Sequence, residues 1–254
     1  MNSMEIVVII SKQDKAGMNI ASCLDEKGIE YVLRDEKSYN CENIDKEINA
    51  DMFIFATKHE SQAEVNSLSV HAPGNFGKAE LGGRDRELCV APAGYLKKAL
   101  IELEKRKLGG FEVVQEVTHH GPYLEKPCMF IEIGSNEDAW LNKEAGKVIA
   151  EVIGVLLNWK GEEFRTAIGI GGLHHTPNFK KIILDGSIAI GHVCAKYNLK
   201  DLDEEMLKQM IERNSKKADL VILNWKGLGT EKEKIKKLVE SFDLEIKRTK
   251  EIKN

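Results

Sequence analysis

This 254-residue sequence has few cysteines and no large excess of charge of either sign. Its cysteines are odd in number and never spaced as C-x-x-C; they are Cys23, Cys41, Cys89, Cys128 and Cys194. We therefore expect reduced thiols in the cytoplasm, and neither a disulfide framework nor a thiolate zinc site. The net charge of −4 excludes a surface that is basic throughout. A nucleic-acid partner would need lysines clustered on one face.

The sequence also lacks long apolar runs. A transmembrane helix needs about 18 consecutive apolar residues, and no such run occurs. The first ten residues lack the basic and apolar segments of a signal peptide, so we expect none. With 42% hydrophobic and 31% charged residues, the composition is typical of a globular protein with a sizeable core. We predict a single α/β domain over residues 1–254.

Strand-like and helix-like segments alternate along the chain. The apolar pattern predicts strands at 5–10, 30–33, 52–56, 112–117, 129–133, 167–170, 182–184, 188–190 and 219–224. Helices are predicted around residues 20–24 with a stop at Gly28, over 94–107, from a capping box at Ser135 and Asp138, around Met206 to Ile211, and from a second box at Thr230 and Glu233. This alternation predicts an α/β fold with a mixed or largely parallel sheet and helices on both faces.

Six of the seven histidines lie in or beside glycine-containing loops. The stretches are H-A-P-G-N from His71, H-H-G-P from His119, G-I-G-G-L-H-H from Gly169, and G-H at Gly191. Ligands of such sheets bind in loops beyond the carboxyl ends of strands, so we expect several of these imidazoles to share one cleft. The alternative is that each histidine bonds only the backbone of its own loop.

No H-E-x-x-H motif is present, so any metal site must combine residues that are distant in the sequence. Nitrogen ligands could come from His71, His119, His120, His174 and His192, and carboxylate ligands from Glu80, Glu132 and Asp185. A zinc ion there would polarise an ester carbonyl and lower the pKa of its water.

Two further motifs could bind a substrate. Gly169, Gly171 and Gly172 form G-x-G-G after a predicted strand, where backbone N–H groups could hold a carbonyl oxygen or a phosphate; a tight turn is the alternative. Thr176 and Pro177 follow at once, so we expect no helix on this loop and no dinucleotide fingerprint. Arg84, in A-E-L-G-G-R, could bind a phosphate or a carboxylate, or be a solvated loop residue.

The order of the motifs is more specific than any one of them. Along the chain stand H-A-P-G-N-F-G-K-A-E-L-G-G at 71–83, V-T-H-H-G-P at 117–122, F-I-E-I-G-S at 130–135, G-I-G-G-L-H-H at 169–175 and G-H-V-C-A-K-Y at 191–197. Together they resemble the archaeal-type D-aminoacyl-tRNA deacylase family, which also occurs in plants. The likeness covers nearly the whole chain, from the N-terminal strand to W-K-G at 225–227.

The resemblance implies hydrolysis of the ester between a D-amino acid and the 3′ end of tRNA, with broad tolerance of the side chain. It also implies zinc dependence and a core resembling peptidyl-tRNA hydrolases and nucleoside phosphorylases. On this basis we predict catalytic roles for His119, His120, His174, His192 and Glu132. Zinc ligands are expected at His71, His119, His174, His192 and Glu80, and substrate contacts at Gly169, Gly171, Gly172, Asn75, Lys196 and Arg84.

The expected partner is tRNA, with no membrane and no obligatory protein partner. Lys196, Lys180 and Lys181 are the predicted phosphate patch, because they adjoin the histidine loops in the sequence. The G-I-G-G loop is the predicted reader of configuration at the substrate's Cα. Other functions remain open: a peptidyl-tRNA hydrolase, a nucleoside phosphorylase-like enzyme, or a tRNA- or metal-binding module without catalysis.

Overall fold

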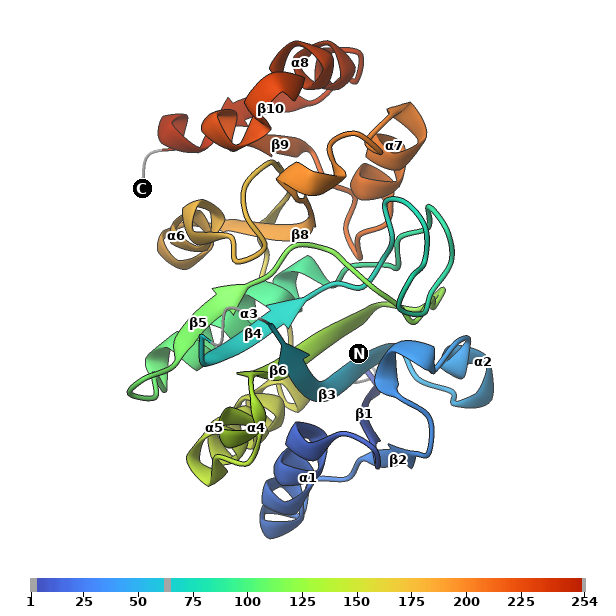
Figure 1. Ribbon diagram of the computed structural model, residues 1–254, viewed down its shortest axis with the longest axis vertical. Helices are drawn as coiled ribbons and strands as arrows, with labels where there is room; N and C mark the ends of the chain where they lie inside the picture. Colours follow the sequence, from blue (N-terminus) through green and yellow to red (C-terminus); the bar gives the residue numbers. More distant parts are fainter. Residues whose placement is uncertain (1–3, 62–64, 253–254) are drawn as a thin grey trace.

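The computed structural model describes residues 4–61 and 65–252, whose strands form two sheets (Figure 1). The first has the strand order β2-β1-β3-β6-β4-β5 and comprises β1 (Ile6–Ser11), β2 (Val32–Arg34), β3 (Met52–Glu60), β4 (Ser67–His71), β5 (Glu112–Gln115) and β6 (Cys128–Ser135). The second has the order β10-β9-β7-β8 and comprises β7 (Arg165–Ile170), β8 (Ile188–Cys194), β9 (Leu220–Leu223) and β10 (Glu245–Arg248). The predicted α/β class is confirmed, but the sequence did not reveal that the strands divide between two sheets.

Strand direction changes inside the first sheet. Its neighbouring strands are parallel except for β4 and β6, which are antiparallel. The register therefore pairs His71, the last residue of β4, with Phe130, and Ser69 with Glu132. Side chains from the middle of β6 thus meet the end of β4, which places polar groups on the face of the sheet.

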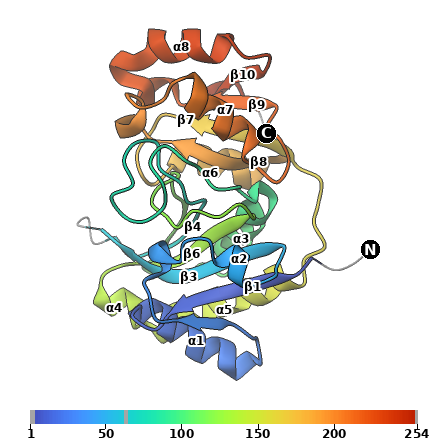
Figure 2. The same cartoon turned by 90° about the vertical axis from the view of Figure 1, so that its right-hand side faces the viewer.

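Helices cover both sheets. The helices are α1 (Lys15–Lys27), α2 (Ile44–Glu47), α3 (Ala93–Lys105), α4 (Glu137–Trp140), α5 (Lys143–Leu157), α6 (Pro177–Asp185), α7 (Glu204–Glu212) and α8 (Lys232–Glu240), with 3-10 turns η1 (Ser38–Asn40), η2 (Lys196–Asn198), η3 (Trp225–Glu231) and η4 (Thr249–Glu251). In Figure 2, α1 and α5 lie below the first sheet and α8 lies at the opposite end of the molecule. Helix α3 packs on β4 and β5 and also on β8, so it joins the two sheets.

The predicted strand at 182–184 is wrong, because these residues belong to α6. Phe179, Ile182 and Ile183 form its buried side, and their spacing is that of a helix. Pro177 stands at the first helical position, where its missing N–H costs no hydrogen bond. The expectation that no helix begins after Thr176 is therefore also wrong.

Both predicted capping boxes are wrong as well. Ser135 is the last residue of β6, and the expected single helix is two helices. The Asn136 side chain accepts from the N–H of Ala139 to begin α4, and the Asn142 side chain accepts from the N–H of Ala145 to begin α5. Helix α8 begins at Lys232 without a side-chain cap. The predicted stop of α1 is confirmed, since Gly28 has φ 64° in the left-handed region.

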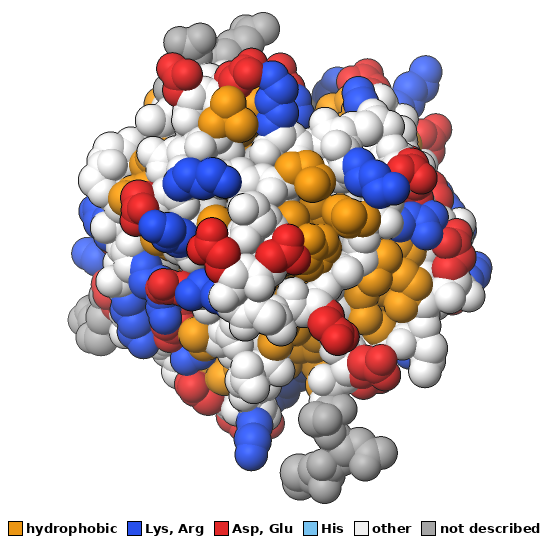
Figure 3. Space-filling model, turned by 90° about the horizontal axis from the view of Figure 1, so that it is seen from below, with side chains coloured by type: hydrophobic (Ala, Val, Ile, Leu, Met, Phe, Trp, Pro, Cys, Tyr) orange, Lys and Arg blue, Asp and Glu red, His pale blue; other side chains and the backbone are white. Residues whose placement is uncertain are grey.

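All five cysteines are buried and free, as expected. Within residues 4–61 and 65–252, no helix has the length and apolar character needed to cross a membrane. Figure 3 shows the end of the molecule formed by α1 and α5, where basic, acidic and hydrophobic side chains are interspersed. No large area of one charge covers this end.

Candidate functional site

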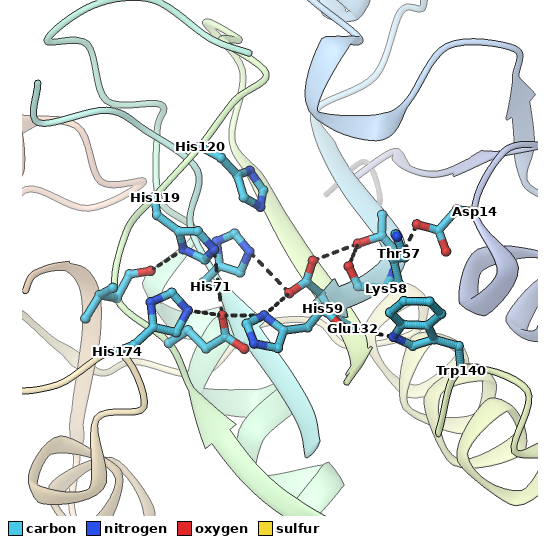
Figure 4. A network of polar contacts seen from close by, with 12 residues as sticks. Asp14, Thr57, Lys58, His59, His71, His119, His120, Glu132, Trp140 and His174 are labelled. Atoms are coloured by element: carbon cyan, nitrogen blue, oxygen red, sulfur yellow. Dashed lines mark hydrogen bonds and ion pairs between the residues drawn. The ribbon is translucent and has the colours of Figure 1, made fainter. Parts of the chain in front are cut away.

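Histidines and carboxylates from both sheets converge on one buried centre (Figure 4). His59 is the last residue but one of β3, His71 is the last residue of β4, and Glu132 lies in β6. The loop after β5 adds Glu116, His119 and His120, and the loop after β7 adds His174. Five separate segments therefore build the centre, which is why no compact sequence signature marks it.

Glu116 lies at the middle of the cluster. Its side chain is fully buried, and His174 Nε2 donates to it at 2.9 Å. His59 Nδ1 lies 3.3 Å and His119 Nε2 lies 3.8 Å from the same carboxylate oxygen. Burial alone would raise the pKa of Glu116, but the hydrogen bonds from His174 and His59 hold it well below its ordinary value. The protein thus keeps an ionised carboxylate inside a ring of imidazoles.

Glu132 is the second buried carboxylate. Strand register places it beside Thr57, whose hydroxyl donates to it at 2.7 Å. His71 Nε2 lies 3.6 Å and His59 Nδ1 lies 3.7 Å away. Burial would raise the pKa of Glu132, but its contact with His71 outweighs that effect and lowers it.

His59 feels both carboxylates. Burial would lower its pKa, but the hydrogen bond to Glu116 and the charges of Glu116 and Glu132 raise it to about 9. The two carboxylates therefore stabilise the protonated form of His59. Gly134 makes room for the His59 ring, because a Cβ at position 134 would lie 3.0 Å from His59 Cδ2.

Three other imidazoles share one hydrogen-bond pattern, from Nδ1 to a backbone carbonyl. Nδ1 lies 3.2 Å from the Ala72 carbonyl in His71, 2.9 Å from the Val117 carbonyl in His119, and 2.6 Å from the Gly121 carbonyl in His120. A carbonyl only accepts, so each Nδ1 carries a proton, and in the neutral form of the ring Nε2 has the free lone pair. Metal-binding histidines are typically oriented by such a bond.

His119 and His120 are held in the neutral form. Burial is the main cause, and the neighbouring His71 adds to it. The pKa of His119 is well below its ordinary value, and that of His120 is about 4. Neutral imidazole is the form that binds a metal ion or accepts a proton.

The residues fit a metal ion. Within the described parts of the chain, three groups have ligand atoms within 4.8 Å of one another: His71, His119 and His120; His59, Glu116 and His174; and His71, Glu116 and Glu132. Four buried atoms of these residues have no hydrogen-bond partner, namely His59 Nε2, His71 Nε2, Glu116 Oε1 and Glu132 Oε2. Buried polar atoms normally have partners, so a cation bound among them would satisfy several at once.

Most of the cluster borders a cleft of about 1280 Å³. His59, His119, His120, Glu132 and His174 face into it. Clefts of this order hold small molecules or the ends of larger ligands. The site can therefore receive a substrate group directly at the histidines.

The structure thus brings together five of the predicted residues, His71, His119, His120, His174 and Glu132. It does not bring His192 to them, and we correct that prediction. His192 is fully buried, its Nε2 lies 2.8 Å and 3.0 Å from the carbonyls of Arg213 and Cys89, and its Nδ1 lies 3.1 Å from Thr118 Oγ1. Both ring nitrogens are used, so neither is left for a metal or a substrate.

Glu80, Asn75 and Arg84 also lie outside the cluster. Glu80 is exposed, and like Asp185 at the end of α6 it belongs to none of the ligand groups found in residues 4–61 and 65–252. Asn75 Nδ2 donates to the carbonyls of Gly82 and Arg84, so it holds the loop after β4. The Arg84 guanidinium lies 4.0 Å from the centre of the Tyr123 ring. The contacts of Asn75 and Arg84 described here are with loop residues and with Tyr123, and not with the histidines of the cluster.

The predicted glycine loop faces another segment of the protein. Gly171 and Gly172 have φ of +92° and +105°, and a Cβ on either would lie 3.0 Å or less from Asn224. A Cβ on Gly169 would lie 3.1 Å from Phe179. Lys196 packs near Gly229 and does not line the cleft. Alanine at 171 or 172 would therefore disturb the fold. The structure thus gives no support to the prediction that this loop recognises the configuration at the substrate's Cα.

Sequence reasoning missed Glu116 and His59. His59 has no glycine beside it, and Glu116 precedes the V-T-H-H-G-P motif by one residue. The available signal was the position of each: a charged or titratable group at the end of an apolar strand. Only the fold shows that the two side chains meet, with His59 Nδ1 3.3 Å from the Glu116 carboxylate.

Fold and site together define an α/β protein with a buried histidine–carboxylate centre of the kind that binds metal ions. A sequence model of the D-aminoacyl-tRNA deacylase family matches residues 46–247. The D-aminoacyl-tRNA deacylase of Pyrococcus horikoshii is 35% identical and that of Pyrococcus furiosus 33% identical, each alignment covering 94% of this chain and 98% of the relative. The chain belongs to the D-aminoacyl-tRNA deacylase family.

A solved structure shares the whole fold. The crystal structure of a conserved protein of unknown function, AF0625, superimposes with a TM-score of 0.91 at 27% identity. The match covers 98% of this chain and 97% of that one. The arrangement of two sheets is therefore found in an experimental structure as well.

Proposed function

We propose that this chain hydrolyses the ester bond of D-aminoacyl-tRNA, using a zinc ion held by the histidine–carboxylate cluster. The observation that carries the proposal is the set of four buried, unpartnered ligand atoms in a cluster that borders an open cleft, in a chain of this family. Because tRNA is the substrate, we place the reaction in the cytoplasm.

The cluster's chemistry suits zinc. Imidazole nitrogen and carboxylate oxygen are ligands that zinc accepts, and Nε2 of His71, His119 and His120 together with Glu116 and Glu132 would hold it. A bound zinc ion supplies Lewis-acid polarisation and a water of lowered pKa.

Several residues of the chain hold the side chains of the site in fixed positions before an ester substrate binds. Glu116 and Thr57 fix His174 and Glu132 by hydrogen bonds, which limits the reorganisation needed when a substrate binds. His120, with its pKa lowered to about 4, is neutral at physiological pH, which is the form that can bind a metal ion through Nε2. The cleft of about 1280 Å³ exceeds the volume of any one side chain, which supports broad acceptance of D-amino acids.

The family assignment favours deacylation over the two other enzyme reactions. A peptidyl-tRNA hydrolase would release an N-blocked peptide, and a nucleoside phosphorylase would release a ribose phosphate. Identification of free D-amino acid as the product separates all three.

The test uses the purified full chain with matched D- and L-aminoacyl-tRNA. We expect loss of the D ester, retention of the L ester, inactivation by a chelator and recovery with Zn²⁺. Glu116→Gln should weaken zinc binding about 10- to 100-fold in competition with a chromophoric chelator. The control is Glu125→Gln, which removes an equal charge from an exposed side chain.

Two results would overturn the proposal. Full activity in a preparation without stoichiometric zinc would remove the metal from it. A zinc-loaded protein that leaves the D ester intact would refute the deacylase function itself.

A further inference from the structure

The cleft extends across the first sheet on both sides of the histidines. One end is formed by η1 and Leu81, and η1 follows β2 at one edge of the sheet. The other end is formed by Phe111, Val113 and Val114 at β5, the opposite edge, together with Leu173. A substrate whose ester lies at the histidines must place its nucleotide in one end and its amino acid in the other.

The η1 end has the only lysine of the cleft, within the described residues, that lacks a carboxylate partner. Lys58 pairs with Glu60 at 2.7 Å, while Lys107 and Lys180 lie 3.8 Å and 2.8 Å from Glu104. Lys37 is exposed, and no ion pair holds it. Lys37 is thus the lysine of the cleft that no direct ion pair holds, although its charge contributes to lowering the pKa of Glu60. Its ammonium remains available to an anion that enters the cleft at this end.

An aromatic ring lies beside that cation. Lys37 Nζ is 5.7 Å from the centre of the Tyr39 ring, which is 6.3 Å from the ring of His120. Leu81 lines the same end, and 54% of its surface is exposed. Tyr39 is half-buried. A cation next to an accessible aromatic ring and an aliphatic side chain is the arrangement that binds single-stranded nucleic acid, with bases stacked and phosphates paired.

The A-E-L-G-G-R loop fixes this arrangement. A Cβ on Gly82, whose φ is +64°, would lie 1.7 Å from the Tyr39 carbonyl oxygen. A Cβ on Gly121 would lie 2.1 Å from the backbone nitrogen of Gly83. The loop is thus wedged between η1 and the H-H-G-P segment, and only glycine permits both approaches. It sets the position of Tyr39 relative to His120, a role that the sequence alone did not give this motif.

We propose that the η1 end of the cleft binds the unpaired 3′-terminal nucleotide of the tRNA. The terminal base packs against Tyr39 and Leu81, and the adjoining phosphate contacts Lys37. The D-amino acid then extends toward Val114 and Leu173, where the lysine charges are already neutralised by Glu104. This assignment rests on the proposed function, because it takes the ester to lie at the histidines.

The test measures binding of a fluorescein-labelled single-stranded RNA ending in C-C-A to the zinc-loaded full chain by anisotropy. Tyr39→Ala should raise Kd about tenfold, the effect of losing one stacked base, and Tyr39→Phe should restore most of the affinity. Lys37→Ala should reduce the slope of log K against log salt by about 0.7. Lys12→Ala, which removes an exposed lysine paired with Asp35, is the control and should change neither.

The same variants are then assayed with D-aminoacyl-tRNA, where KM should rise and kcat should be kept. Leu173→Ala should leave RNA binding unchanged and alter the preference among D-amino acids. The assignment is overturned if Leu173→Ala weakens RNA binding while Tyr39→Ala and Lys37→Ala bind as the wild type does. Because the RNA carries no ester, Tyr39-dependent binding without hydrolysis would refute the deacylase function and leave the nucleotide site in place.

Discussion

His192 follows a glycine at the end of an apolar strand, as a ligand or base would, but the structure gives it a packing role. Its Nε2 faces two carbonyls and must donate, so Nδ1 accepts from the Thr118 hydroxyl. Burial is the main cause that lowers its pKa to about 4. The ring is therefore neutral and links β8 to the backbone of two other segments.

This environment predicts a pH-dependent stability. The folded pKa of about 4 lies below the ordinary value of 6.5, so the unfolded chain takes up the proton first as pH falls. The contribution of the neutral His192 ring to the free energy of unfolding is complete above pH 6.5. It is lost as the pH falls from 6.5 to 4, and the loss amounts to about 3 kcal/mol. In His192→Gln, the amide nitrogen can donate to the same carbonyls without titrating. Urea denaturation should show a smaller loss of stability from pH 7 to pH 4 in this variant, with zinc content unchanged. Parallel curves for variant and wild type would contradict the argument.

Among the elements, α6 determines where the loop with His174 ends. Its C-terminal end is held by the buried Lys97 of α3, whose ammonium donates to the carbonyls of Ile183, Gly186 and Ile188. A cation at this end also interacts favourably with the helix dipole. Burial lowers the pKa of Lys97, and the three carbonyl partners offset part of the desolvation cost.

Lys97→Met keeps the aliphatic volume but leaves these carbonyls without a donor. We expect a loss of about 2–3 kcal/mol in the free energy of unfolding, since buried polar groups lose their partners. The control is Lys105→Met in the same helix. The Lys105 side chain is 61% exposed, so this change should lower the free energy of unfolding by less than about 0.5 kcal/mol. Chemical denaturation of both variants measures the difference. Equal midpoints would mean that α6 does not depend on this contact.

At the scale of the whole molecule, the histidine–carboxylate cluster joins the two sheets. His174 follows β7 of the second sheet, and its partner Glu116 follows β5 of the first. Nearby, the Val117 N–H donates to the His174 carbonyl at 3.1 Å, and the Thr118 N–H donates to Val193 at 2.9 Å. An ion bound in the cluster would therefore stabilise contacts between sheets as well as the site.

Zinc should consequently raise the melting temperature of the whole chain. A ligand at a hundredfold excess over its Kd stabilises the folded state by about 3 kcal/mol, which corresponds to roughly 5–10 °C for a chain of this length. Differential scanning fluorimetry with and without a chelator measures the shift. The shift should shrink in Glu116→Gln and persist in Glu125→Gln. An equal shift in all three proteins would place the zinc elsewhere.

The sequence by itself determined the fold class, the family and most of the elements. Apolar periodicity is a local property, so β1, α1 and α3 could be predicted within a few residues of their observed bounds. The histidine motifs are also local, and they identified five residues of the cluster. Short apolar runs were misleading, because Ile182–Leu184 fits a strand until Phe179 and Pro177 are included in a helical turn.

The tertiary structure alone decided which groups meet. Strand order and the reversed β4 bring His59, Glu116 and Glu132 to one face. The pairing of β3 with β6 likewise joins Thr57 to Glu132, which is 75 residues further along the chain. The same packing turns His192 away from the cluster and seats Tyr39 beside His120. A side chain's neighbours depend on how strands order and pair over long distances, and that information is carried by the packing of the whole chain. Local sequence specifies the candidates for a site, and only the fold selects among them.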